Sequence, residues 1–129
     1  MPTDPAADPA TATTAASDPD CLFCRIVAGE VPAEVVHTTA RTLAFRDLSP
    51  QAPTHVLVVP RDHHADAAAL ATADPEACAE LVRTAAAVAT AEGYADYRLV
   101  FNTGAGAGQS VFHAHLHVLA GRDLGWPPG

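Results

Sequence analysis

The stretch SVFHAHLHVLAGR, residues 110–122, places histidine at every second position, as His113, His115 and His117. Side chains of a β-strand point alternately to its two faces, so an extended backbone sends all three imidazoles to the same side. An imidazole can act as a nucleophile, as a proton donor or acceptor, or as a metal ligand. Because packing alone explains three such rings in an apolar strand poorly, we expect a catalytic site or a metal site here.

A glycine-rich loop, NTGAGAGQS at residues 102–110, leads into this stretch. Gly104, Gly106 and Gly108 let backbone N–H groups approach an anion closely. The loop precedes a strand, which excludes the dinucleotide-binding and P-loop motifs, in which such a loop opens a helix. Alone it would be a plain hairpin connection, but beside Ser110 and the histidines it predicts a phosphate-binding loop.

A second pattern of reactive side chains is the C-x-x-C spacing of Cys21 and Cys24. In a chain without a secretory signal, this spacing favours metal or redox chemistry over a disulfide framework. With His63 and His113 the two thiols form a set of ligand types that suits a tetrahedral structural zinc. The neighbouring His64 could replace His63, but its side chain is expected to point the other way.

The length and composition of the chain predict one small folded domain. The chain has 129 residues, and much of its 49% apolar content is alanine, so the core must be small. The net charge of −8 argues against broad binding to nucleic acid or to anionic membranes. No apolar run approaches the roughly 18–20 residues of a membrane span, and we expect a cytoplasmic protein.

Composition separates a tail from the domain. Residues 1–20 consist almost entirely of Ala, Pro, Thr and Asp, which predicts a disordered segment, and they lack the basic and apolar regions of a secretory signal. The folded domain is expected over residues 21–129.

Periodicity within that domain predicts an α+β fold, with an antiparallel sheet of about five strands, a short N-terminal helix and one long helix. The short helix should end at Gly29, and the long one should run from Asp74-Pro75 to before Gly93. Its apolar stripe is expected to comprise Cys78, Leu81, Val82, Ala85 and Ala89. The strands are expected at residues 34–38, 42–47, 55–60, 97–102 and 112–121.

The alternation HAHLHVL, residues 113–119, resembles the signature of the histidine triad (HIT) superfamily of nucleotide hydrolases and transferases. The stretches DLSPQAPTHVLVVPRDH and GQSVFHAHLHVLAGR, with the terminal WPPG, resemble its Hint branch, the purine nucleoside phosphoramidases. The resemblance runs from Cys21 to Gly129. It implies a HIT-like fold paired across a homodimer.

The resemblance also implies a mechanism that uses no catalytic cofactor. His115 would attack the phosphorus of a purine nucleoside phosphoramidate, and water would hydrolyse the resulting nucleotidyl-histidine. His117, Ser110 and the N–H groups near Gly108 and Val111 would hold the phosphoryl oxygens. A backbone carbonyl at the level of His117 would fix the tautomer of the nucleophile.

Nucleoside-binding residues follow from the same resemblance. Asp47 would accept hydrogen bonds from the ribose hydroxyls, although it could simply cap a turn. Asn102 would face the phosphate and ribose, and Trp126 would line the partner subunit's site. An apolar group, which could equally be ordinary core, would sandwich the purine: Phe23, Ile26, Val31, Phe45 and Leu48.

Several questions stay open at this point. Some members of the superfamily carry zinc at positions matching Cys21, Cys24, His63 and His113, whereas in metal-free members the two histidines belong to the active-site network. His55 is expected to be structural. Alternative functions are a nucleotidyl transferase or dinucleotide polyphosphate hydrolase, a zinc hydrolase using all three histidines, and a non-catalytic nucleotide-binding module.

Overall fold

The computed structural model describes residues 17–129, so the predicted tail lies outside the described residues except for its last four positions. Residues 18–20 form a turn in which the Asp18 backbone N–H donates to Cys24 Sγ at 3.3 Å. The elements follow in the order α1 (Leu22–Val27), β1 (Val35–Thr38), β2 (Thr42–Arg46), β3 (Thr54–Pro60), α2 (Ala67–Ala73), α3 (Pro75–Ala91), β4 (Arg98–Phe101) and β5 (Leu116–Ala120).

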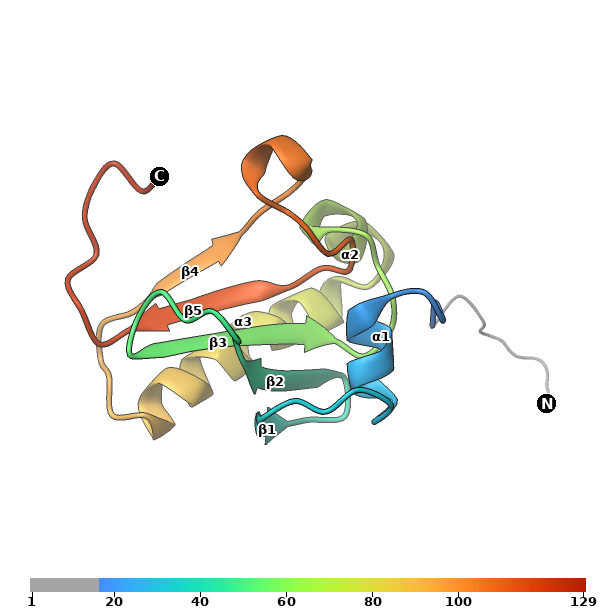
Figure 1. Cartoon of the computed structure of the whole chain (residues 1–129), viewed down its shortest axis with the longest axis horizontal. Helices are drawn as coiled ribbons and strands as arrows, with labels where there is room; N and C mark the ends of the chain where they lie inside the picture. Colours follow the sequence, from blue (N-terminus) through green and yellow to red (C-terminus); the bar gives the residue numbers. More distant parts are fainter. Residues whose placement is uncertain (1–16) are drawn as a thin grey trace.

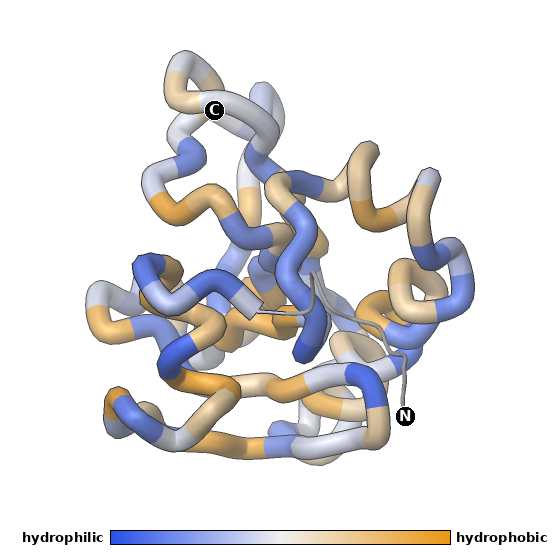
Figure 2. The backbone as a smooth tube through the Cα atoms, turned by 90° about the vertical axis from the view of Figure 1, so that its right-hand side faces the viewer, coloured by the Kyte–Doolittle hydropathy of each residue, from blue (hydrophilic) through white to orange (hydrophobic). Residues whose placement is uncertain are grey.

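The strands form one antiparallel sheet in the order β1-β2-β3-β5-β4, which confirms the predicted α+β architecture with five strands. The long helix α3 lies behind this sheet and α1 lies across its front (Figure 1). In the side view, hydrophobic stretches of the chain lie between hydrophilic turns (Figure 2). Because α3 covers one face of the sheet and α1 the other, each face buries a separate group of side chains.

The face against α3 carries the larger core. Val56 and Val58 of β3 and Leu116 and Val118 of β5 are buried there against Leu81 and its neighbours on α3. Residues one position away along the same strands point to the front face. There, Phe45 and Leu57, which pair across β2 and β3, pack against the α1 side chains.

The helix α2 was not predicted from the sequence. Asp66 caps it, because its side chain accepts a hydrogen bond from the Ala69 N–H at 2.9 Å, and Asp74 ends it. Asp74 then caps α3 in the same way, and an aspartate followed by an alanine-rich run is the pattern that could have predicted α2. Among residues 17–129, none of the helices is long and apolar enough to cross a membrane.

Two further predictions are wrong in detail. The inner stripe of α3 excludes Val82, which is 45% exposed, and includes Thr84 and Val88 instead. The last strand begins at Leu116 rather than at residue 112, so His113 and His115 precede it. A hydrogen bond to a residue outside the sheet holds the irregular backbone before β5, because the Ala114 N–H donates to the His64 carbonyl at 2.7 Å.

Candidate active site

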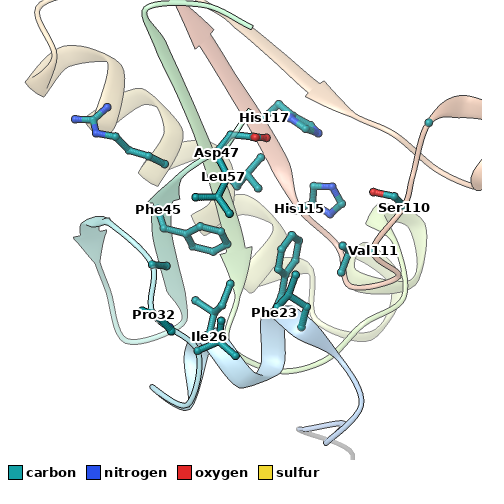
Figure 3. A pocket seen from close by; sticks show the side chains of 16 residues that line it. Phe23, Ile26, Pro32, Phe45, Asp47, Leu57, Ser110, Val111, His115 and His117 are labelled. Atoms are coloured by element: carbon teal, nitrogen blue, oxygen red, sulfur yellow. The ribbon is translucent and has the colours of Figure 1, made fainter. Parts of the chain in front are cut away.

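A cavity of about 270 Å³ opens on the front face of the sheet, between α1 and the segment that leads into β5. Its floor is apolar, with Phe23 and Ile26 from α1 and Phe45 from β2 (Figure 3). Its polar side carries His115, His117 and neighbouring loop residues. Of the predicted nucleotide-binding residues, the cavity brings together Phe23, Ile26, Val31, Phe45, Asp47, Leu48, Gly108, Ser110, Val111, His115 and His117.

His115 is oriented by the backbone of a neighbouring histidine. Its Nδ1 lies 2.8 Å from the carbonyl oxygen of His113, and a carbonyl can only accept, so Nδ1 carries the proton. The carbonyl was expected at the level of His117, and the structure corrects this to His113. The neutral ring then has a free lone pair on Nε2, the form that a nucleophilic imidazole requires.

His117 is oriented by His55, which sequence reasoning had treated as structural. The Gln51 backbone N–H donates to His55 Nδ1 at 3.0 Å, so a neutral His55 carries its proton on Nε2. That Nε2 lies 2.9 Å from His117 Nδ1 and donates to it. His117 therefore carries its own proton on Nε2, which is buried and has no protein partner within residues 17–129.

Both of these rings are held neutral by their surroundings. Burial, and after it the repulsion that the neighbouring His115 and His55 exert when protonated, lowers the pKa of His117 from an ordinary 6.5 to about 4. Burial also lowers the pKa of His55, against the opposing effect of the Asp47 carboxylate. At neutral pH the pair thus has one N–H without an acceptor in residues 17–129, on His117 Nε2, and hydrogen bonding fixes the position of this proton.

Asp47 lies beside this pair. Its Oδ1 accepts from the Ser49 N–H at 2.7 Å, which is the turn-capping contact, and Oδ2 lies 3.4 Å from His55 Nε2. Asp47, His55 and His117 are close enough together to resemble a metal site. A metal ligand would need a lone pair on His55 Nε2, however, and the Gln51 N–H places the proton there, so this trio fits a hydrogen-bonded network better.

The glycine-rich loop reaches the cavity at Gly108, Ser110 and Val111. Gly104 and Gly108 have φ angles of +87° and +96°, which residues with a Cβ rarely adopt. A single 3₁₀ turn over Ala105–Ala107 lies between them. The loop thus carries a hydroxyl and backbone groups to the rim beside His115 (Figure 3).

Two predicted residues lie away from the cavity of this chain. Asn102 follows β4 and is not among the residues that line it, although its Nδ2 lies close to Gly108. Trp126 is 83% exposed in the C-terminal segment. The other apolar lining residues, which were not predicted, are Leu22, Pro32, Ala33 and Leu57. Period-two alternation along β3 from Val59 could have found Leu57.

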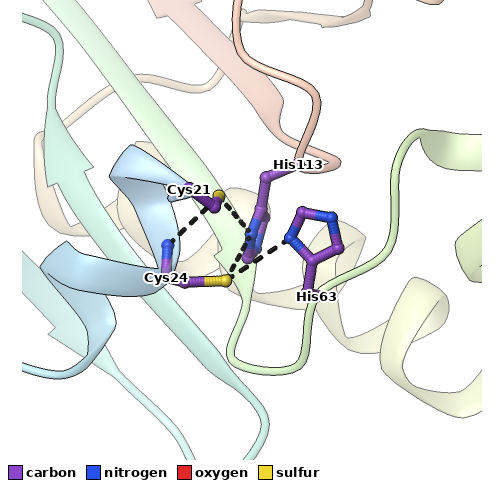
Figure 4. A group of neighbouring side chains, drawn as sticks. All are labelled: Cys21, Cys24, His63 and His113. Atoms are coloured by element: carbon purple, nitrogen blue, oxygen red, sulfur yellow. Dashed lines mark hydrogen bonds between the residues drawn. The ribbon is translucent and has the colours of Figure 1, made fainter. Parts of the chain in front are cut away.

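The two cysteines and the two predicted histidine ligands meet under the N-terminus of α1 (Figure 4). Cys21 Sγ lies 3.4 Å from His113 Nδ1, and Cys24 Sγ lies 3.4 Å from His63 Nδ1 and 3.5 Å from His113 Nδ1. A tetrahedral zinc, with bonds of about 2.3 Å to sulfur and 2.0 Å to nitrogen, separates these atoms by about 3.5 Å. The residues present fit the metal, with His63 rather than His64 as the ligand.

The surroundings of this cluster support the same assignment. His113 Nε2 lies 2.9 Å from the Pro60 carbonyl oxygen, so it carries the proton and leaves the Nδ1 lone pair directed at the thiols. Burial raises the pKa of the Cys24 thiol and lowers that of His113 to about 4, so without a cation both of these side chains are neutral at neutral pH. His63 and His113 do not line the cavity, which separates the cluster from the cavity chemistry.

Comparisons with known proteins agree with this geometry. The HIT domain family matches residues 28–124, and the chain therefore belongs to the HIT family. An uncharacterized HIT-like protein of Synechococcus elongatus is 46% identical over 112 residues, covering 85% of this chain and 97% of that protein. A 14 kDa zinc-binding protein of Zea mays is 42% identical over 115 residues, covering 87% and 90%.

Solved structures extend the comparison to three dimensions. A HIT family hydrolase from Legionella pneumophila superposes with a TM-score of 0.81 at 49% identity, covering 85% of this chain and all of that one. A histidine triad protein from Clostridium difficile gives a TM-score of 0.80 at 35% identity, covering 84% and 96%. The chain thus has the HIT fold and resembles hydrolases of this family.

Proposed function

We propose that this protein hydrolyses the P–N bond of purine nucleoside phosphoramidates, including aminoacyl-adenylate-type substrates, as the Hint branch of the HIT family does. One observation carries the proposal: the His113 carbonyl holds the proton of His115 on Nδ1 and leaves Nε2 free beside the cavity. A neutral, oriented imidazole of this kind is suited to nucleophilic attack at phosphorus.

The residues at the polar side of the cavity then act either as the nucleophile or as donors to the phosphoryl group. His115 Nε2 attacks the phosphorus, the P–N bond of the substrate breaks, and the amine leaves with a proton taken from solvent. Water then cleaves the bond between phosphorus and Nε2 and releases the nucleoside monophosphate. The buried N–H of His117 and the Ser110 hydroxyl donate to the phosphoryl oxygens as negative charge builds on them. The N–H groups near Gly108 and Val111 add to this set of donors, because they lie at the same rim.

The nucleoside occupies the opposite part of the cavity. The purine lies against Phe23, Ile26 and Phe45, an apolar surface that suits a flat ring. Asp47 accepts from the ribose hydroxyls with the lone pairs that the Ser49 N–H leaves free. Val31 and Leu48 close the side of the purine, and Leu48, 98% exposed here, becomes covered when a nucleotide binds.

The Cys21, Cys24, His63 and His113 cluster holds a structural zinc in this proposal. Support comes from the 3.4–3.5 Å separations of sulfur and nitrogen and from the zinc-binding protein of Zea mays. Zinc there supplies a cross-link between α1 and the segment before β5 and no chemistry in the cavity.

The zinc assignment is tested by metal analysis of three proteins. Wild type and Cys78→Ser should each contain about one zinc per chain, because Cys78 lies on α3, outside the cluster. Cys24→Ser should lose most of the metal and unfold at a lower temperature. Equal zinc contents in wild type and Cys24→Ser would contradict the assignment.

The reaction is tested by following release of AMP from adenosine phosphoramidate and from diadenosine polyphosphates. The proposal expects much faster turnover of the phosphoramidate, whereas a dinucleotide hydrolase would reverse that order. A chelator should slow turnover only as far as it unfolds the chain, which circular dichroism reports. Loss of turnover in folded, metal-free protein would favour a zinc hydrolase, and AMP binding without turnover a nucleotide-binding module.

The zinc hydrolase is the weaker alternative on the geometry. Of the three aligned histidines only His113 belongs to the cysteine cluster, while Nδ1 of His115 and of His117 are engaged in hydrogen bonds. We further propose a homodimer, as the resemblance to the Hint branch implies, with the Trp126 segment of one chain reaching the site of the other.

A further inference from the structure

Gln109 lies between two cavity residues and is itself buried, with 3% of its surface exposed. A buried amide requires partners for its oxygen and its two N–H groups, and leaving them unpaired costs free energy. Gln109 follows the positive-φ Gly108 and precedes Ser110 in the loop beside His115. Its side chain points away from the cavity lining, so it has no place in the substrate contacts above.

Each polar atom of this amide has a defined partner. Oε1 accepts from the Gly104 N–H at 2.8 Å, and Nε2 donates to the carbonyls of Ala65 at 2.8 Å and Val111 at 3.1 Å. Because an N–H only donates and a carbonyl only accepts, these partners also fix which end of the amide is which. The backbone N–H of Gln109 returns a bond to the Gly104 carbonyl at 3.1 Å.

These bonds connect both ends of the loop to each other and to the turn after β3. Gly104 lies near the start of the glycine-rich loop, Val111 directly follows the loop, and Ala65 lies two residues after the metal-cluster residue His63. One side chain therefore ties both ends of the loop together and ties the loop to the turn that carries His63. A loop of glycines needs such an external restraint, since its own backbone freedom is large.

We propose that Gln109 is a positioning residue that preorganises the loop for the phosphoryl group of a bound nucleotide. It contacts no substrate atom and acts through Gly108, Ser110 and Val111, whose rim position it fixes. The inference rests on the proposed nucleotide-binding function. It implies that Gln109 matters for the phosphate and not for the nucleoside, which lies against α1 and β2.

The test is to measure by calorimetry the affinity of the full-length, zinc-loaded protein for AMP and for adenosine. Gln109→Met keeps the length and volume of the side chain but removes its three hydrogen bonds. We expect AMP to bind about 10-fold more weakly to this variant, because the donors are no longer preorganised, and adenosine to bind within about twofold of wild type. Glu76→Met, at an exposed position of α3, provides a matched control that should leave both affinities unchanged.

Equal weakening of AMP and adenosine would overturn the proposal, since it indicates general loosening of the fold, and so would an unchanged affinity for AMP. If Gln109→Met fails to fold, Gln109→Asn decides in the same way, because its shorter amide cannot reach Gly104, Ala65 and Val111 together and adds no charge. Wild type that prefers AMP but does not cleave phosphoramidate would refute the proposed function and leave this inference standing. Wild type with no preference for AMP over adenosine would refute the inference.

Discussion

At the scale of single residues, the site depends on proton positions that backbone groups impose. The His113 carbonyl sets the proton of His115, and the Gln51 N–H sets that of His55 and, through it, that of His117. Each assignment follows from a partner that can only donate or only accept. The two rings beside the cavity therefore have different roles, one as a lone-pair nucleophile and the other as an N–H donor.

Replacing His55 should affect the chemical step more than binding. His55→Phe keeps a ring but removes the N–H that orients His117, so we expect kcat to fall by about 10- to 100-fold. This loss is smaller than the roughly 100- to 1,000-fold cost of removing an oxyanion donor outright. Steady-state kinetics with adenosine phosphoramidate measures it, with His37→Ala on β1 as the control histidine. An unchanged kcat in His55→Phe would return His55 to a purely structural role.

The lowered pKa of His117 makes stability depend on pH. The folded chain keeps this ring neutral down to about pH 4, whereas the unfolded chain protonates it near the ordinary value of 6.5. Acid therefore favours the unfolded state. The part of the free energy of unfolding that depends on a neutral His117 is lost as the pH falls from about 6.5 to about 4. Between about pH 7 and about pH 5 it amounts to at most about 2 kcal/mol.

Urea unfolding of wild type and His117→Gln at those two pH values measures this contribution. The free energy of unfolding should fall more steeply in wild type than in the variant, because only wild type has the ring that resists protonation. Parallel losses would show that His117 titrates normally in the folded chain.

At the scale of elements, the fold could be predicted well wherever a local pattern determined it. The ends of β2, β3 and α3 lie within one residue of the prediction, because aspartate caps, prolines and glycines mark them in the sequence. The start of β5 could not be predicted in this way. The apolar-histidine alternation continues through residue 113, but a hydrogen bond from Ala114 to the distant His64 takes that backbone out of the sheet.

The candidate site shows the same limit. Histidine spacing identified His115 and His117, yet the partner that orients His117 depends on the register between β3 and β5, in which Leu57 pairs with His117. That register places His55 within reach, and no feature of residues 54–60 alone reveals it. The two cysteines were predictable, because C-x-x-C is a local pattern, and the family resemblance supported His63 and His113 as their partners. The carbonyl of His113 as the partner of His115 was not predictable.

The turn after β5 contains a glycine whose role is steric. A Cβ on Gly121 would lie 2.8 Å from Pro53 Cβ and 2.9 Å from Tyr94 Oη, and the residue has a φ of +100°. Gly93 has a similar φ of +90° but open space around it. Gly93→Ala should cost about 1–2 kcal/mol of stability from backbone strain alone.

Gly121→Ala should cost roughly 1–3 kcal/mol more, because it adds overpacking to the same strain. Urea unfolding of the two variants side by side gives the difference directly. If both lose the same stability, the contacts of Gly121 with Pro53 and Tyr94 relax at little cost and the steric argument fails.

At the scale of the whole molecule, several large apolar side chains are left uncovered in the isolated chain. Leu48, Phe112 and Trp126 are 98%, 54% and 83% exposed. The C-terminal segment that carries Trp126 is held by Arg98, whose guanidinium donates to the carbonyls of Leu124 and Gly125. An anchored segment that presents its apolar side chain to solvent fits the proposed homodimer, in which a partner covers it.

Trp126 is the only tryptophan, so it reports on this assembly. Sedimentation should give the mass of a dimer, and tryptophan emission should lie at shorter wavelength than in urea-unfolded protein because the partner excludes water from the ring. Dilution below the dimer dissociation constant should move the emission toward the unfolded value. A monomer at all concentrations, with emission like that of unfolded protein, would contradict the proposed dimer.

The proposed mechanism requires His115 to form a covalent nucleotidyl intermediate, which intact-protein mass spectrometry detects after the protein is mixed with adenosine phosphoramidate. Wild type should gain the mass of one adenylyl group, lose it in acid, and release AMP. His115→Ala should show neither the adduct nor turnover, because the free Nε2 is gone. Turnover that persists in folded His115→Ala would contradict this mechanism and point to attack by water instead.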